Sequence, residues 1–342
     1  MKENNKIQLS DHFTYGKMMR FTLPPVVMMI FTSIYGVVDG FFVSNFVGKS
    51  AFTAVNFVMP VIMILGGLGF MFGTGGSALI AKTLGEGDSE RANGIFSMLI
   101  LFSALCGVAI AGIGLAVLRP VVALLGAEGE LLENSILYAR VVIIGIPALF
   151  LQYEFQSLLV TAEKPKLGLW VTVAAGVTNM ALDALFVAVF RWGIVGAAVA
   201  TVLSECIGGL LPVVYFFCKN TSRLRFTKPV FSGWDLLRIC TNGSSELMSN
   251  IAMSLVSMLY NTQLLRYAGE DGVAAYGVLM YVSMIFVAVF IGFSVGTAPV
   301  IGFHFGAQNH GELKSLLRKS LTVISVFSVC MFALALGLAK PL

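Results

Sequence analysis

The chain has 342 residues, of which 57% are hydrophobic and 12% are charged, and its formal net charge is +4. An average soluble domain is about 25% charged, so this composition indicates a protein that crosses a membrane several times rather than a soluble globular one. No run of like charges favours nucleic-acid binding, and neither the five cysteines nor the three histidines have the spacing of a metal site.

Nine apolar segments follow one another along the chain, and each is long enough for a helix that crosses a hydrocarbon core of ~30 Å. They cover residues 21–44, 54–81, 95–118, 134–158, 167–190, 194–217, 236–262, 274–303 and 318–339. None alternates with the two-residue period of a barrel strand, so α-helices remain the way to satisfy the backbone inside a bilayer. The sequence predicts an all-α polytopic membrane protein.

The first segment carries a phenol and a carboxylate, Tyr35 and Asp39, four residues apart and therefore on one face of a helix. An acid at the centre of a membrane helix costs about 2.5–3.5 kcal/mol on insertion scales, which makes such a residue a functional candidate. The alternative is that Asp39 lies at the outer end of its span and is solvated at the interface.

Glycines in the second segment have the spacing of closely packed membrane helices, and they also mark an internal repeat. Residues 48–85 align with residues 269–306 without a gap. The identical glycines are Gly48 and Gly269, Gly75 and Gly296, and Gly85 and Gly306. An even number of spans separates the two copies, so the repeat is parallel, as in secondary transporters built from two halves around a central site.

Two halves of six helices require twelve helices, of which nine lie in this chain. We therefore expect a product truncated after the ninth helix, and the alternative is a genuine nine-span protein. The longest polar connection follows the sixth segment, and Ser232 and Asp235 at its end have the spacing of a helix-capping pair. The predicted domains are a six-helix lobe at 1–218, an inter-lobe linker at 219–235 and a partial three-helix lobe at 236–342.

Polar side chains recur in the fifth and sixth segments, which a short turn joins into an apolar hairpin. Asn179 and Asp183 are four residues apart on the fifth segment, and Thr201 and Glu205 are four apart on the sixth. Each pair lies on one helix face. An apolar hairpin that retains two carboxylates is a candidate functional element.

Basic residues gather on one side of the predicted membrane topology. Most of the 22 Lys and Arg residues fall on the side of the N-terminus, so the positive-inside rule predicts a cytoplasmic N-terminus. Counting at about 1.5 Å per residue then brings the polar groups of segments one, five and six to a similar depth, between the midplane and the outer leaflet. The six residues are Tyr35, Asp39, Asn179, Asp183, Thr201 and Glu205.

Such a cluster can exchange ions, because carboxylates in an apolar pocket resist ionisation and can take up and release protons. The oxygens of Asp39, Asn179, Asp183 and Thr201 could instead hold Na⁺. No enzymatic nucleophile–base pair and no cofactor site is present in the pattern, so we expect no enzyme and no cofactor beyond the coupling ion.

Three further polar residues lie in or near the spans. Glu246 and Asn250 share a face near the start of the seventh segment, where they either line a substrate cavity or are simply solvated. Glu154, near the end of the fourth segment, is expected at the membrane interface.

At these residues the chain resembles the multidrug and toxic compound extrusion (MATE) family. The resemblance rests on Tyr35 and Asp39 followed by Gly-Phe-Phe-Val-Ser, on the glycine-rich second span, and on Asn179 with Asp183. It also includes Thr-Ala-Glu-Lys-Pro at 161–165 and the Gly-Ala-Ala-Val-Ala-Thr run that ends at Thr201. It covers the whole chain.

The resemblance implies a V-shaped, two-lobe exporter of cationic amphipathic drugs that exchanges them for H⁺ or Na⁺. In the branch whose ion site lies in the N-terminal lobe, the matching positions are Tyr35, Asp39, Asn179, Asp183 and Thr201. The chain departs from the family at Ala184, where proline is frequent, and Glu205 has no assigned role. The partners implied are small organic cations and the lipid bilayer, with no nucleic acid.

A monomer in the cytoplasmic (inner) membrane of a prokaryote is the state we expect. The alternatives are a lipid-linked saccharide flippase of the same superfamily, which would need a cationic cavity for a pyrophosphate, and a truncated product that does not transport.

Overall fold

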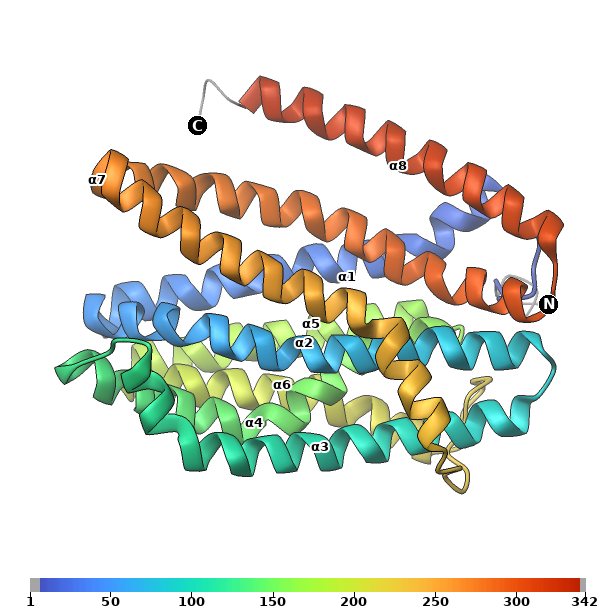
Figure 1. Cartoon of the computed structure of the whole chain (residues 1–342), viewed down its shortest axis with the longest axis horizontal. Helices are drawn as coiled ribbons and strands as arrows, with labels where there is room; N and C mark the ends of the chain where they lie inside the picture. Colours follow the sequence, from blue (N-terminus) through green and yellow to red (C-terminus); the bar gives the residue numbers. More distant parts are fainter. Residues whose placement is uncertain (1–6, 339–342) are drawn as a thin grey trace.

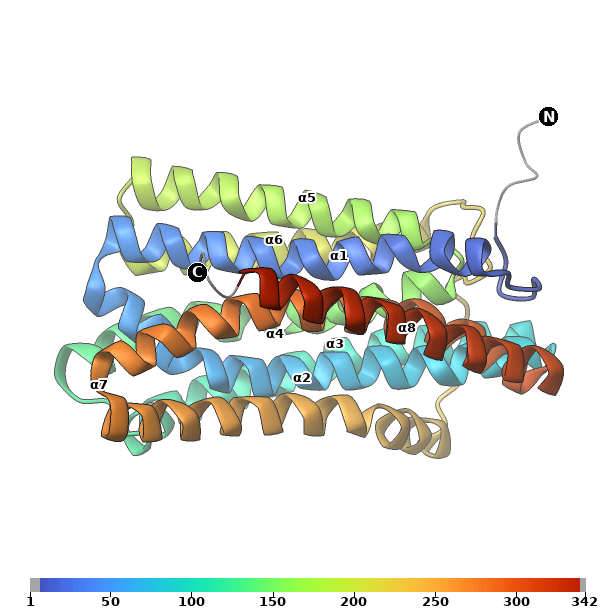
Figure 2. The same cartoon turned by 90° about the horizontal axis from the view of Figure 1, so that it is seen from above.

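The computed structural model describes the backbone of residues 7–338, and their side chains apart from residues 49, 258, 261, 262, 265, 268–278, 281, 282 and 338. Within this part of the chain every regular element is a helix and there is no strand (Figure 1). The helices run roughly along one common axis, and a second view shows the same bundle from above (Figure 2). The all-α architecture predicted from the sequence is confirmed.

Eight α-helices and two short π-helices make up the described fold. They are α1 (Tyr15–Phe42), η1 (Val43–Val47), α2 (Lys49–Gly85), α3 (Ser89–Leu124), α4 (Gly129–Thr161), α5 (Pro165–Asp183), η2 (Ala184–Val189), α6 (Gly193–Phe217), α7 (Gly233–Gly306) and α8 (His310–Leu338). Most begin or end several residues outside the predicted spans, because the hydropathy of a segment marks its membrane-embedded part while the helix continues beyond it.

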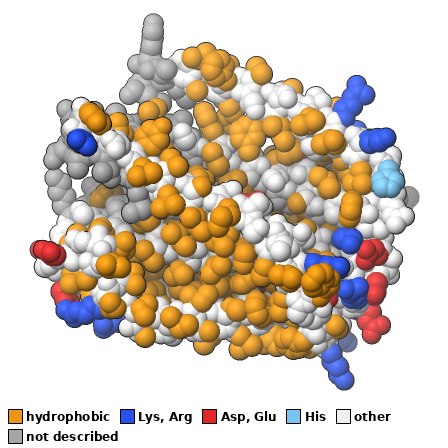
Figure 3. All heavy atoms as spheres, viewed as in Figure 1, with side chains coloured by type: hydrophobic (Ala, Val, Ile, Leu, Met, Phe, Trp, Pro, Cys, Tyr) orange, Lys and Arg blue, Asp and Glu red, His pale blue; other side chains and the backbone are white. Residues whose placement is uncertain are grey.

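Eight stretches of the described helices are long and apolar enough to cross a membrane. Residues 236–262, the seventh predicted span, are helical but do not belong to this set, because polar residues such as Asn242, Glu246 and Asn250 interrupt them. Hydrophobic side chains cover the middle of the face in Figure 3, and charged ones gather toward the ends. This distribution is that of a multi-pass membrane protein.

Helix α7 is not straight, although its helical assignment runs without a break over 74 residues. Gly243 packs against Met71 of α2, and Gly306 packs against Lys82 of the same helix. In a straight helix the two glycines would be about 95 Å apart, whereas Met71 and Lys82 are about 16 Å apart at 1.5 Å per residue. The chain therefore turns back on itself, and Figure 1 shows two antiparallel limbs that meet at the end opposite the N-terminus.

The predicted repeat is visible in a reciprocal pair of contacts: α2 packs on the first limb of α7, and the second limb of α7 packs on α1. Gly75 of α2 has no room for a side chain beside Gly243, and Gly296 of α7 has none beside Thr22. Thr22 and Gly243 occupy the same position in the two aligned copies, as Gly75 and Gly296 do. Each copy thus places its glycine against the preceding helix of the other copy, the pattern that a twofold axis produces.

The end of the bundle that carries the N-terminus is held together by polar contacts, and we call it the basic end. Residues 219–232 form an irregular loop that packs on α3, where Arg225 N–H donates to Asn93 Oδ1 at 2.8 Å. The predicted cap is partly confirmed: Asp235 N–H donates to Ser232 Oγ at 3.2 Å. The Asp235 carboxylate, however, pairs with Arg91 at 3.1 Å, whereas in a capping box it would accept a hydrogen bond from the backbone N–H of Ser232.

Candidate functional site

The residues predicted to form an ion site lie on three neighbouring helices of the first repeat. Asp39 comes from α1, Asp183 ends α5 and Glu205 comes from α6, and all three carboxylates are buried. Helix α5 packs against both α1 and α6. The helix periodicity that grouped these residues in the sequence therefore corresponds to real helix faces turned toward one another.

The carboxyl groups of Asp39 and Asp183 face each other across the contact between α1 and α5. They are close enough for a hydrogen bond when one of them carries a proton. Within the described residues, neither Asp183 oxygen has a conventional hydrogen-bond donor, and Asp39 Oδ1 has none. Two facing carboxylates repel each other unless something positive lies between them. The pair can therefore hold one proton or one small cation.

Both helices that bear these acids change their hydrogen-bond pattern next to them. Helix α1 gives way to η1 at Val43, about one helical turn after Asp39. Helix η2 begins at Ala184, directly after Asp183. The two π-helices contact each other. Isolated π-helical turns are often found at functional sites, since they rotate the side chains that precede them relative to those that follow.

Glu205 adds a third carboxylate, and small residues make the space for it. A Cβ on Gly145 of α4 would lie 2.7 Å from Val202 Cγ2 and 3.0 Å from Glu205 Oε2, so a side chain there would crowd both residues. The charge of Glu205 acts on Tyr35, and that of Asp39 acts on Glu205. Glu205 Oε2 has no partner among the described side chains. The structure thus brings Glu205 to the cluster.

Asn179 and Thr201 contribute neutral oxygens that differ in their hydrogen bonding. The Asn179 side chain is buried, and its Oδ1 finds no donor in the described part of the chain. The Thr201 hydroxyl donates to the Ala197 carbonyl at 3.0 Å, which leaves its lone pairs free to accept or to bind a cation. Together with the acids they form a set of oxygens suited to a small hard cation.

Helix α4 supplies site residues that the sequence analysis missed. Tyr138 is buried beside the Thr201 hydroxyl and near all three carboxylates. Gln152 Nε2 donates to Tyr35 Oη at 3.5 Å. Polar residues four apart in an apolar span, Gln152 and Gln156, are the same signal that identified Asn179 and Asp183, and they could have been found in that way.

Glu154, expected at the membrane interface, is instead fully buried, so that prediction was wrong. Its carboxylate lies near Ser103 of α3, and both of its oxygens lack a hydrogen-bond donor within the geometric limits in the described structure. The backbone of α2 at Gly73 packs directly on Glu154. The position of Glu154 near the end of its span suggested exposure, but α2 and α3 cover that end of α4 in the fold.

Glu246 and Asn250 are half-buried on the first limb of α7, apart from the acidic cluster. Asn250 Nδ2 donates to the Glu246 carbonyl at 2.9 Å, and its side chain packs against Gly67 of α2. They lie at the contact between the two repeats, which is compatible with a cavity wall.

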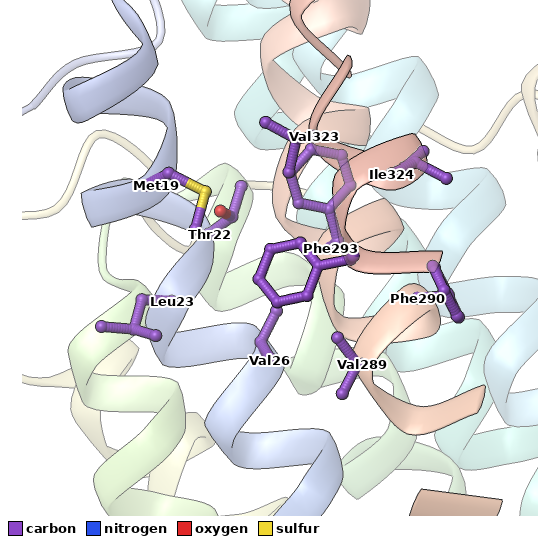
Figure 4. A pocket seen from close by; sticks show the side chains of 10 residues that line it. Met19, Thr22, Leu23, Val26, Val289, Phe290, Phe293, Val323 and Ile324 are labelled. Carbon is purple, nitrogen blue, oxygen red and sulfur yellow. The ribbon is translucent and has the colours of Figure 1, made fainter. Parts of the chain in front are cut away.

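An apolar cavity of about 30 Å³ lies elsewhere, between α1, α7 and α8 (Figure 4). Its lining includes Met19, Leu23, Val26, Phe293 and Val323. It contains no acid and is therefore unsuited to an ion. Among the described residues, no group of three or more His, Cys, Asp or Glu side chains could hold a metal ion.

Comparison with known proteins identifies the family. Residues 24–185 and 247–342 match the MatE family. The chain belongs to the MatE family. This confirms the resemblance found in the sequence, and MatE members are membrane transport proteins rather than enzymes.

Curated relatives of this MatE chain include the multidrug export protein MepA of Staphylococcus saprophyticus, which is 25% identical over 336 residues. The match covers 97% of this chain and 73% of the relative. MepA of Staphylococcus aureus strain MSSA476 is 26% identical over 338 residues, with coverage of 97% and 74%.

Solved MatE-like structures superpose closely on the chain. An outward-facing multidrug resistance MATE transporter of the MOP superfamily gives a TM-score of 0.91 at 25% identity, and the match covers 100% of this chain and 76% of that one. A MOP superfamily transporter from Pyrococcus furiosus, described as having a binding pocket of reverse polarity, gives 0.89 at 25% identity, with coverage of 99% and 75%.

Proposed function

We propose that this MatE chain is an ion-coupled antiporter that exports cationic amphipathic drugs by alternating access, with H⁺ or Na⁺ as the coupling ion. The observation that carries the proposal is the facing pair Asp39 and Asp183, buried with Glu205 in the first repeat. A pair of carboxylates without a positive partner is stable only when it holds a proton or a cation.

Exchange follows from the energetics of this pair. When the ion leaves, Asp39 and Asp183 repel each other, and α1 and α5 are pushed apart or rearranged. When the ion returns, the two helices can close again. A ligand moves such an equilibrium only by its different affinity for the two states, so ion binding must favour one arrangement of the helices over the other. Drug bound in the opposite arrangement would then be released as the ion binds.

Cationic drugs are the substrate class that an acidic interior favours, and the multidrug export function of the MepA relatives supports drug export in general. The wall of the cavity on the second repeat would include Glu246 and Asn250. The proposed setting is the cytoplasmic membrane of a bacterium, with a monomeric chain and its N-terminus and basic end in the cytoplasm.

The test is transport in proteoliposomes with either a proton gradient or a Na⁺ gradient imposed. We expect one gradient to drive uptake of a fluorescent organic cation by the unmodified protein. Asp183→Asn should abolish this uptake, because an amide cannot exchange the ion, while membrane insertion stays normal. Asp11→Asn, at the polar surface of the basic end, is the matched control and should transport normally. Transport by Asp183→Asn at the unmodified rate would exclude the site assignment.

A further inference from the structure

A second buried polar pocket lies in the first repeat beside the candidate ion site. Its cavity of about 10 Å³ between α4, α5 and α6 has room for about one water molecule. Three polar side chains line it: Gln152, Gln156 and Thr172, which are 5%, 3% and 4% exposed. The exchange cycle described above uses neither Gln156 nor Thr172.

The amides of this pocket lack protein partners. Neither Oε1 nor Nε2 of Gln156 has a hydrogen bond within the described structure, and Gln152 Oε1 has none either. Buried polar groups are almost always hydrogen-bonded, to ordered water where the protein offers no partner. The space is built into the packing, because a Cβ on Gly208 of α6 would lie 2.7 Å from Gln152 Cγ. The pocket is therefore suited to bound water.

The same residues lead to the ion site. Gln152 uses its other amide atom, Nε2, to donate to Tyr35 Oη at 3.5 Å, and Tyr35 is one helical turn before Asp39. On α5, Thr172 precedes Asn179 by about two turns, on the side of the basic end. A line of polar groups thus runs from the carboxylates through Tyr35 and Gln152 to the pocket.

We propose that Gln152, Gln156 and Thr172 form a hydrated relay that passes the coupling ion to and from the acidic cluster, on the side of the cluster that faces the basic end. Neutral amide and hydroxyl groups can coordinate H₃O⁺ or Na⁺ without holding it as strongly as a carboxylate does. This inference rests on the proposed antiport and names the ion's path within it. No groups other than neutral ones face the pocket from its three helices.

Gln156 gives a test that separates a wet relay from ordinary packing. Gln156→Leu keeps the volume and removes the polar atoms, whereas Gln156→Ser loses volume but keeps a hydroxyl and adds space for water. A relay predicts that Leu slows ion-driven transport by about tenfold or more and that Ser is close to the unmodified protein. Packing alone predicts the reverse order. The drug concentration at half-maximal rate should stay unchanged in both variants, because neither touches the acids.

A second measurement does not depend on transport. Internal water generates hydroxyl radicals in an X-ray beam, so the buried ring of Phe155, which also lines the pocket, should be oxidised in the unmodified protein and not in Gln156→Leu. Normal transport by Gln156→Leu, or an unlabelled Phe155 in the unmodified protein, would overturn the relay and leave the antiport proposal standing. Absence of ion-driven transport in the unmodified protein would remove both.

Discussion

At the scale of single residues, the acidic cluster contains two kinds of side chain: carboxylates that have no positively charged partner, and neutral polar residues that surround them. Tyr138 belongs to the second kind, because its hydroxyl lies beside Thr201 and near three carboxylates. We predict that Tyr138→Phe weakens ion binding by up to about tenfold, the effect of one lost hydrogen bond. The ion concentration at half-maximal transport measures this. Tyr15→Phe, on an exposed tyrosine, is the control, and equal behaviour of the two variants would deny Tyr138 a part in the site.

The residues that could be predicted from sequence are those whose chemistry conflicts with their surroundings. Asp39, Asp183 and Glu205 stood out because an acid in an apolar helix is costly, and helix periodicity then gave their shared faces. Tyr138 did not stand out, because a tyrosine fits a membrane helix and its role arises only from the packing of α4 on α6. Glu154 was misplaced for a related reason, since neighbouring helices and not its own sequence determine its burial.

At the scale of helices, glycines set how closely the two repeats approach. A side chain on Gly75 or Gly296 would collide with backbone or buried atoms of the other repeat, whereas Gly112 of α3 has open space around it. We predict that Gly75→Ala and Gly296→Ala each lower the free energy of unfolding by about 1–3 kcal/mol, as overpacking does. Thermal unfolding in detergent measures this. Gly112→Ala should melt like the unmodified protein, and equal melting of all three variants would contradict the repeat packing.

The two limbs of α7 could be predicted in part from hydropathy and in part from the internal repeat. Hydropathy predicted two spans, 236–262 and 274–303, and the fold contains two antiparallel limbs, although the helical assignment is continuous. The aligned glycines predicted a parallel repeat, and in the structure they lie where the two copies contact each other. The first limb is less apolar than the other membrane-spanning stretches, because Asn242, Glu246 and Asn250 interrupt its apolar residues.

At the scale of the whole molecule, the N-terminal segment connects the two repeats at the basic end. Leu9 N–H donates to Glu163 of the first repeat at 3.0 Å, and Phe13 N–H donates to Glu312 of α8 at 2.9 Å. Lys319 of α8 also contacts the Phe13 carbonyl. Any opening of the bundle at this end must break one of these two attachments.

These attachments can be tested one at a time. Glu163→Ala should accelerate hydrogen exchange of the Leu9 amide, and Glu312→Ala that of the Phe13 amide, each by about tenfold or more, since bonds to charged groups are the stronger ones. Exchange followed at single-residue resolution measures both, and each variant is the control for the other. If neither amide responds to either variant, the segment does not connect the repeats as described.

The central claim is that Asp39 and Asp183 together hold the coupling ion, and drug-evoked ion release tests it most directly. A pH-sensitive dye and a Na⁺ electrode would record what the purified protein releases when an organic cation binds. We predict release of H⁺ or Na⁺ from the unmodified protein and from the surface variant Asp11→Asn, and none from Asp39→Asn or Asp183→Asn. Undiminished release from either buried variant would contradict the claim.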